Sequence, residues 1–162
     1  MRSFAILLLV ATALAAQTKA DPYEGLWQGF DGEWGYVSRH LLALARATPA
    51  NKFDFRPAPG VRTMAEIYMH IAGANFVLVS VTGVAIPADA KAAKFDQIHT
   101  KAEVVQWLER SLDFVKTARA RLKPGDLERK IRHAGREVPV DGMYLRTIVH
   151  ANEHLGQLIA YA

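Results

Sequence analysis

The sequence contains no cysteine, and this absence limits its chemistry before any motif is considered. Without thiols the chain forms no disulfide, offers no thiolate nucleophile and holds no metal through sulfur. Any metal site must therefore use nitrogen and oxygen ligands. The 162 residues, 51% of them hydrophobic, are enough for one domain with a single core.

A strong excess of either charge is also missing. Two of the 20 Lys and Arg residues lie in the first 20 positions, where there is no acid, so the rest of the chain has 18 basic residues against 16 acidic ones. Its net charge is then only +2, and the densest basic segment, residues 128–137, resembles a loop. This pattern is typical of a solvated surface and argues against a nucleic-acid partner.

Long hydrophobic runs are missing except at the N-terminus. Residues 1–20 combine a positively charged start, a 13-residue apolar run at 4–16 and small-x-small sequences at 13–15 and 18–20. This layout is typical of a secretory signal peptide, and the run is shorter than the roughly 20 residues that span a bilayer. We expect cleavage of residues 1–20, export to the periplasm or outside the cell, and no membrane span in the mature domain of residues 21–162.

Apolar residues at three- and four-residue steps predict four helices with little strand signal between them. The first is expected over residues 25–47, ending before a Thr-Pro pair. The second follows a Pro-rich loop and begins at a capping box formed by Thr63 and Glu66. It is expected to end near Gly83.

The second half of the chain continues this pattern. A polar connection over about residues 88–99 leads to a third helix, which begins at another capping box, Thr100 and Glu103. Residues 126–140 are irregular with a short strand-like pair, and Asp141 is the expected N-cap of a fourth helix reaching the chain end. The fold class predicted is all-α: an up-and-down-like four-helix bundle with a strand-like segment before the last helix.

The histidines are the candidates for chemistry in this predicted bundle. His150 and His154 are four residues apart in the last helix, so both imidazoles leave one face, as a clamp on a metal ion requires. His70 lies within the apolar stripe of the second helix and is the natural third ligand. Three protein ligands match a catalytic zinc-type site with one open position. Weaker candidates are His40, which could lie near the core, His99 and His133.

The same segment also has the H-x-x-E-H spacing of a zinc protease family in which the glutamate is the general base. The third ligand there is a carboxylate well downstream, but only eight residues follow His154, and none is Asp or Glu. The sequence argues against this interpretation, and we expect Glu153 to be a solvated carboxylate. Gln157 and Tyr161 share the face of His150 and His154 and could orient a substrate.

Two segments carry a family resemblance. One is FDFRPAPGVRTMAEIYMHIA, a Pro-rich loop leading into the helix with His70; the other is IVHANEHLGQLIAY, where H-x-x-x-H precedes Gly-Gln. Together they resemble the DinB-like superfamily of metal-dependent four-helix-bundle proteins, across essentially the whole mature domain. The resemblance implies that His70, His150 and His154 coordinate a divalent metal, zinc or nickel. It also implies a homodimer, to which exposed aromatics such as Trp27 and Trp107 could contribute.

Three hypotheses about function remain open at this point. The first is a metal-dependent enzyme of hydrolase or transferase type, acting on a small molecule, with no general base identified. Some branches of the family are thiol S-transferases or thiol-dependent isomerases. The second is a metal- or small-ligand-binding bundle without turnover, such as a stress or envelope protein. The third is a structural protein whose histidines only pack, and it predicts no effect of a chelator on stability.

Overall fold

The computed structural model describes residues 29–162, so the predicted signal peptide and the first residues of the first predicted helix lie outside it. The described part contains five α-helices, two strands and two short 3-10 helices. In order they are α1 (Gly29–Ala47), η2 (Ala50–Lys52), α2 (Met64–Ser80), α3 (Ala88–Ala92), η3 (Phe95–Gln97), α4 (Lys101–Ala120), β1 (Lys130–His133), β2 (Arg136–Pro139) and α5 (Val140–Tyr161). None of the described helices combines the length and apolar character needed to cross a bilayer.

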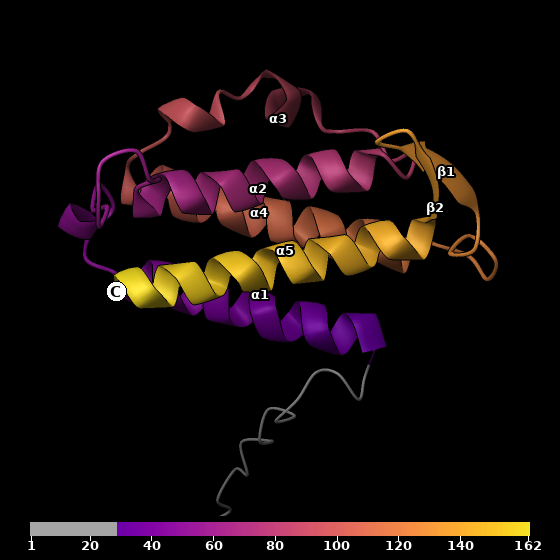
Figure 1. The fold of residues 1–162 in the computed structure, drawn as a ribbon, viewed down its shortest axis with the longest axis horizontal. Coiled ribbons are helices and arrows are strands. Elements are labelled where there is room, and N and C mark those ends of the chain that lie inside the picture. The colour runs from indigo at the N-terminus through magenta and orange to yellow at the C-terminus, as the bar shows by residue number, and fades with distance from the viewer. Residues whose placement is uncertain (1–28) are drawn as a thin grey trace, which may run out of the picture.

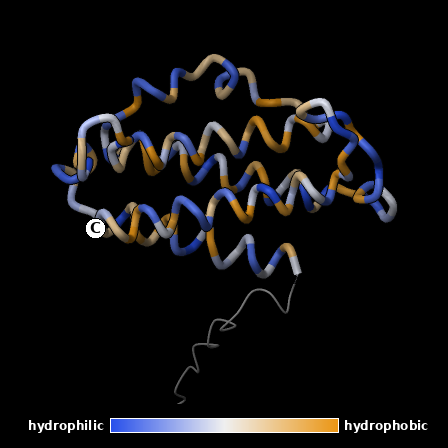
Figure 2. Tube along the Cα trace, viewed as in Figure 1, coloured by the Kyte–Doolittle hydropathy of each residue, from blue (hydrophilic) through white to orange (hydrophobic). Residues whose placement is uncertain are grey.

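The four long helices lie side by side along one direction, with α3 outside α2 (Figure 1). Helix α2 packs against α4 and α5, and α1 packs against the same two helices from the other side. The colours show that α2 and α5 run in opposite directions (Figure 1). Hydrophobic and hydrophilic residues alternate along each long helix (Figure 2), and the hydrophobic ones fill one core. The predicted helical class is therefore confirmed, with a small two-stranded sheet added.

The two predicted capping boxes start helices as expected. Thr63 accepts a hydrogen bond from the backbone N–H of Glu66, and its own N–H donates to the Glu66 carboxylate at 2.7 Å. Thr100 also accepts from the N–H of Glu103, but it is its hydroxyl that donates to the Glu103 carboxylate. The first box is thus reciprocal through the backbone, and both satisfy N–H groups that a helix start leaves unpaired.

The start of the last helix differs from its prediction. Helix α5 begins at Val140 with Pro139 in the N-cap position, so Asp141 lies inside the first turn and is not the cap. The backbone N–H groups of Val140 and Asp141 donate to the carbonyls of Arg129 and Leu127, each at 3.0 Å. The preceding loop therefore supplies the acceptors that a capping side chain would otherwise provide.

The predicted strand-like pair before α5 is confirmed as an antiparallel hairpin. Strands β1 and β2 pair with Ile131 opposite Val138. The two-residue turn between them has positive φ at both Ala134 (48°) and Gly135 (76°), the pattern of the turn type that matches the twist of paired strands. The hairpin holds the loop carbonyls in place at the start of α5.

The polar connection before α4 is more ordered than predicted, because it contains α3 and η3. Ala90 of α3 is buried, and Phe95 of η3 packs against Phe76 and Trp107, with ring centroids 6.1 and 5.2 Å apart. Trp107 is consequently half-buried, and the expectation that it is exposed was wrong. Trp27 lies outside the described residues.

Candidate metal centre

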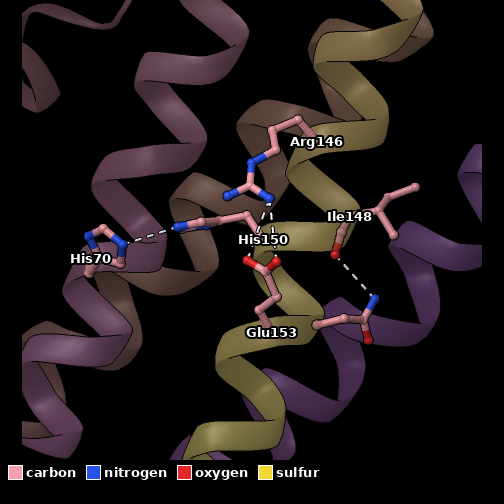
Figure 3. A network of polar contacts seen from close by, with 6 residues as sticks. His70, Arg146, Ile148, His150 and Glu153 are labelled. Atoms are coloured by element: carbon pink, nitrogen blue, oxygen red, sulfur yellow. Dashed lines mark hydrogen bonds and ion pairs between the residues drawn. The ribbon is translucent and has the colours of Figure 1, made fainter.

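Three histidines from two helices meet on one side of the helix assembly. His70 comes from the middle of α2, and His150 and His154 come from α5. The Nε2 atoms of His70 and His150 are 3.1 Å apart (Figure 3). Each of the three side chains offers a ring nitrogen, and these nitrogens all lie within 4.8 Å of one another. The histidines singled out from the sequence are therefore brought together; we call them the histidine triad.

Core packing of α2 and α5 explains this placement. Ile71 and Ala151 are fully buried, and each directly follows a triad histidine in the sequence. One residue corresponds to a rotation of about 100° around a helix. His70 and His150 therefore lie at the edges of the buried faces, where the two antiparallel helices approach each other. His150 is buried, with 7% of its surface exposed, while His70 and His154 are half-buried.

The surroundings of His70 and His150 favour their neutral form. Burial lowers the pKa of His70, and the charges of Arg62 and His154 lower it further. Burial also lowers the pKa of His150 to about 4, with contributions from His154, His70 and Arg146. Neutral imidazoles have the free lone pair that a metal ligand must offer. His70 and His150 are thus in the protonation state suited to metal binding at neutral pH.

A hydrogen-bonded chain along α5 holds the third histidine. The Nδ1 atom of His154 lies 3.0 Å from Oε1 of Gln157, and Nε2 of Gln157 donates to the Tyr161 hydroxyl at 3.0 Å. Because an amide oxygen only accepts, Nδ1 of His154 carries the proton and Nε2 keeps its lone pair. Gln157 and Tyr161, expected to orient a substrate, orient His154 in this structure.

The triad fits a divalent metal in its donor atoms and their spacing. Two nitrogens bound tetrahedrally to one zinc ion lie about 3.3 Å apart, given zinc–nitrogen distances of about 2.0–2.1 Å. The 3.1 Å between the nitrogens of His70 and His150 is close to that value. The outer ring nitrogens differ in their hydrogen bonding. Nδ1 of His154 contacts Gln157, whereas Nδ1 of His150 is buried without a hydrogen-bond partner among the described residues.

Glu153 is exposed and lies 3.5 Å from Arg146, about two turns away on α5 (Figure 3). The expectation of a solvated carboxylate is confirmed, and nothing places Glu153 as a base beside the triad. The weaker histidine candidates lie elsewhere: His99 in the connection before α4 and His133 at the end of β1. His40 is exposed on α1, where its Nδ1 lies 2.8 Å from the carbonyl of Tyr36, so the expectation that it lies near the core was wrong.

A cleft of about 690 Å³ opens beside His70, which sequence analysis did not predict. The loop over residues 56–62, the outer face of α2 and the η3 turn form its walls. Such a volume accommodates a small organic molecule. The signal in the sequence was weak: two arginines, Arg56 and Arg62, in the Pro-rich loop before α2.

Comparison with known proteins agrees with this geometry. The family model of the DinB superfamily matches residues 35–158, which include the whole triad. No curated protein sequence matches the chain.

Solved structures with a similar fold were also found. A DinB-like protein from Bacillus cereus ATCC 10987 has a TM-score of 0.73 at 21% identity, covering 83% of this chain and 89% of that one. A candidate DinB family member from Exiguobacterium sibiricum 255-15 has a TM-score of 0.62 at 22% identity, covering 83% and 87%. A conserved protein from Enterococcus faecalis has a TM-score of 0.67 at 15% identity, covering 83% and 93%. At these identities the similarity concerns the fold.

Proposed function

The chain belongs to the DinB superfamily, and from this premise we propose that it is an exported, metal-dependent enzyme of hydrolase or transferase type. His70, His150 and His154 would bind one divalent ion, zinc or nickel, and the substrate would be a small molecule. Export rests on the signal-peptide pattern of residues 1–20. We also interpret the four long helices, each packed against two others, as the predicted four-helix bundle.

The observation that carries the proposal is the convergence of the triad. The Nε2 atoms of His70 and His150 face each other at hydrogen-bond distance, 3.1 Å, and a metal ion held by the three imidazoles would replace that contact. The cluster consists of three imidazole nitrogens, and no carboxylate belongs to it among the described residues. Such a donor set favours a divalent cation that prefers imidazole ligands. The hydrogen bond from His154 to Gln157 is the outer support expected of a metal ligand.

The arrangement also suits catalysis, because three protein ligands leave a coordination position open. A divalent ion at the triad would supply Lewis-acid activation of a water or of a substrate atom. His70 borders the 690 Å³ cleft, so a molecule in the cleft has access to the triad. Gln157 holds the proton on Nδ1 of His154, and Arg62 adds positive charge on the cleft side of His70.

One observation favours the alternative, a bundle that binds a metal or small ligand without turnover. Glu153, the carboxylate nearest to the triad in the sequence, is exposed and paired with Arg146. Among the described residues we identify no side chain in the position of a general base. A non-catalytic protein would keep the same triad and the same metal.

Metal analysis and activity together test the proposal. Protein purified without chelators should contain one zinc or nickel ion per chain, and the His70→Ala and His150→Ala variants should contain none. His40→Ala, an exposed histidine on α1, is the matched control and should retain the ion. Metal-dependent turnover of ester, amide or thiol-transfer substrates that is lost with the ion would support an enzyme. Absence of metal in the unaltered protein would refute the proposal.

A further inference from the structure

The cleft beside His70 is built by side chains from three separate segments. The loop before α2 contributes Arg62 and Val61, α2 contributes Met69 and Val77, and η3 contributes Phe95 and Asp96. Gly73 of α2 lies beside the Phe95 ring, where an added Cβ would make an ordinary van der Waals contact at 3.4 Å. The cleft therefore combines apolar walls with charged groups at its edges.

Arg56, one of the two arginines that line the cleft, is already engaged in contacts within the loop and with the start of α2. Arg56 lies 3.5 Å from the Glu66 carboxylate and donates to the backbone carbonyl of Val61 at 3.3 Å. Glu66 in turn accepts from the backbone N–H of Thr63 in the capping box. These contacts tie the loop to the start of α2 and neutralise the charge of Arg56.

Arg62 differs from Arg56 in having no such partner. Within residues 29–162 it forms no hydrogen bond or ion pair, and its side chain is exposed at the cleft. Its charge nevertheless reaches the triad, since it contributes to the lowered pKa of His70. A guanidinium held at the mouth of an apolar cleft, with its donors unused, is suited to binding an anion.

We propose that the cleft binds a small organic carboxylate, with its carboxylate on Arg62 and its apolar body against Met69 and Val77. The carboxylate is a substrate only if the proposed enzymatic function holds, and in that case the inference names the substrate class. Histidine ligands add no negative charge, so the charge of a divalent ion bound at the triad would be uncompensated, which further favours an anionic molecule.

The charge balance of the cleft favours a carboxylate over a phosphate. Among the cleft residues that the structure describes, Arg56 and Glu66 form an ion pair, which leaves the guanidinium of Arg62 and the carboxylate of Asp96. A doubly charged phosphate would meet repulsion from Asp96 and would have only the guanidinium of Arg62 to offset it, because Arg56 is paired with Glu66. A carboxylate carries a single negative charge and matches the two parallel N–H groups of one guanidinium.

A matched series of probes tests the assignment: 4-phenylbutyrate, its neutral amide 4-phenylbutyramide, and phenyl phosphate. Binding is measured by calorimetry on the zinc-loaded protein and on the protein treated with EDTA, after thermal melting shows that both are folded. We expect the carboxylate to bind about tenfold more tightly than the amide, the ratio that 1.4 kcal/mol represents. Tighter binding of phenyl phosphate than of the carboxylate would overturn the assignment.

Variants distinguish a direct contact of Arg62 with the carboxylate from the effect of other positive charges near the triad. Arg62→Gln should remove the preference for the carboxylate while leaving amide binding unchanged, and Arg62→Lys should restore part of it. Arg146→Gln is the matched control, because Arg146 also acts on a triad histidine but is paired with Glu153 and does not line the cleft. An unchanged preference in Arg62→Gln would refute the inference.

The same experiment distinguishes failure of this inference from failure of the proposed function. If no metal binds, the metal-dependent function fails, yet the Arg62-dependent preference is still measured in the EDTA-treated protein. If zinc binds but the preference persists in Arg62→Gln, the inference about the carboxylate fails and the metal site stands.

Discussion

The Nδ1 atom of His154 lies 3.0 Å from the amide oxygen of Gln157, three residues further along α5. The amide nitrogen of Gln157 is itself engaged, since it donates to the Tyr161 hydroxyl at 3.0 Å. With its nitrogen used in this way, the amide presents its oxygen to His154. The contact therefore selects one tautomer of His154 and keeps the other ring nitrogen available as a ligand.

Replacing Gln157 should weaken metal binding without removing it. Gln157→Ala deletes the acceptor that fixes the tautomer and ring orientation of His154, and loss of such outer support typically lowers metal affinity by about 10–100-fold. Zinc affinity is measured by competition with a chromophoric chelator at neutral pH. Gln106→Ala, at an exposed position on α4, is the control and should bind zinc as the unaltered protein does. Equal affinities for the two variants would contradict the role of Gln157.

Metal removal should lower thermal stability through the triad alone. A ligand that binds only the folded state stabilises it by about 2.7 kcal/mol when present at 100 times its Kd. The melting temperature of the unaltered protein should therefore fall on addition of EDTA. His154→Ala should melt at one temperature with zinc or with EDTA, while His40→Ala should respond like the unaltered protein. A chelator without effect on the unaltered protein would favour histidines that only pack.

The stability of the metal-free protein should decrease in acid because of His150. Its pKa is about 4 in the folded state against an ordinary value of 6.5. Between these values the unfolded chain binds a proton that the folded chain does not, so the free energy of unfolding falls as the pH drops from 6.5 towards 4. One such group accounts for up to about 1.4 kcal/mol per pH unit. The lowered pKa of His70 acts in the same direction.

Urea unfolding in EDTA, at about pH 7.5 and pH 5, measures this loss by the linear extrapolation of the free energy of unfolding. His150→Gln keeps a polar side chain of similar length but cannot titrate in this range, so its loss between the two pH values should be smaller. A loss of equal size in both proteins would show that groups other than His150 dominate the acid sensitivity.

Features encoded by nearby residues were predicted best. The capping boxes at Thr63 and Thr100 need only residues three positions apart, and both start helices as predicted. The pairing of His150 with His154 follows from helix geometry in the same way. Joining them to His70, 80 residues earlier, required in addition the apolar stripe of α2 and the family resemblance, because spacing within one helix says nothing about its neighbours.

Features that depend on distant segments could not be predicted. The order in α3 and η3 comes from packing of Phe95 against Trp107, which belongs to a later helix. The cap of α5 comes from backbone carbonyls at Leu127 and Arg129, which carry no side-chain signal. The cleft forms where three segments meet, so no single stretch of sequence indicates it. By contrast, the exposure of Glu153 depends only on its position around α5, and it was predicted correctly.

A buried polar pair in the core should affect stability independently of the metal. Asn75 of α2 donates to the hydroxyl of Ser111 of α4 at 3.2 Å, and both residues are fully buried. Ser111→Ala leaves the Asn75 amide without this acceptor, so it should lower the free energy of unfolding by about 1–3 kcal/mol. Urea denaturation in EDTA measures this change, and zinc content should stay the same.

The double variant Asn75→Leu with Ser111→Ala distinguishes an unpaired polar group from simple loss of volume. Replacing both partners removes the unsatisfied amide, and leucine has the same number and branching of side-chain heavy atoms as asparagine, with a larger volume that the alanine at position 111 partly offsets. The double variant should therefore be more stable than Ser111→Ala alone. If it is less stable, the packing between α2 and α4 around these positions, and not the hydrogen bond, determines the cost. Unchanged zinc content in both variants would show that this pair and the triad, both on α2, act separately.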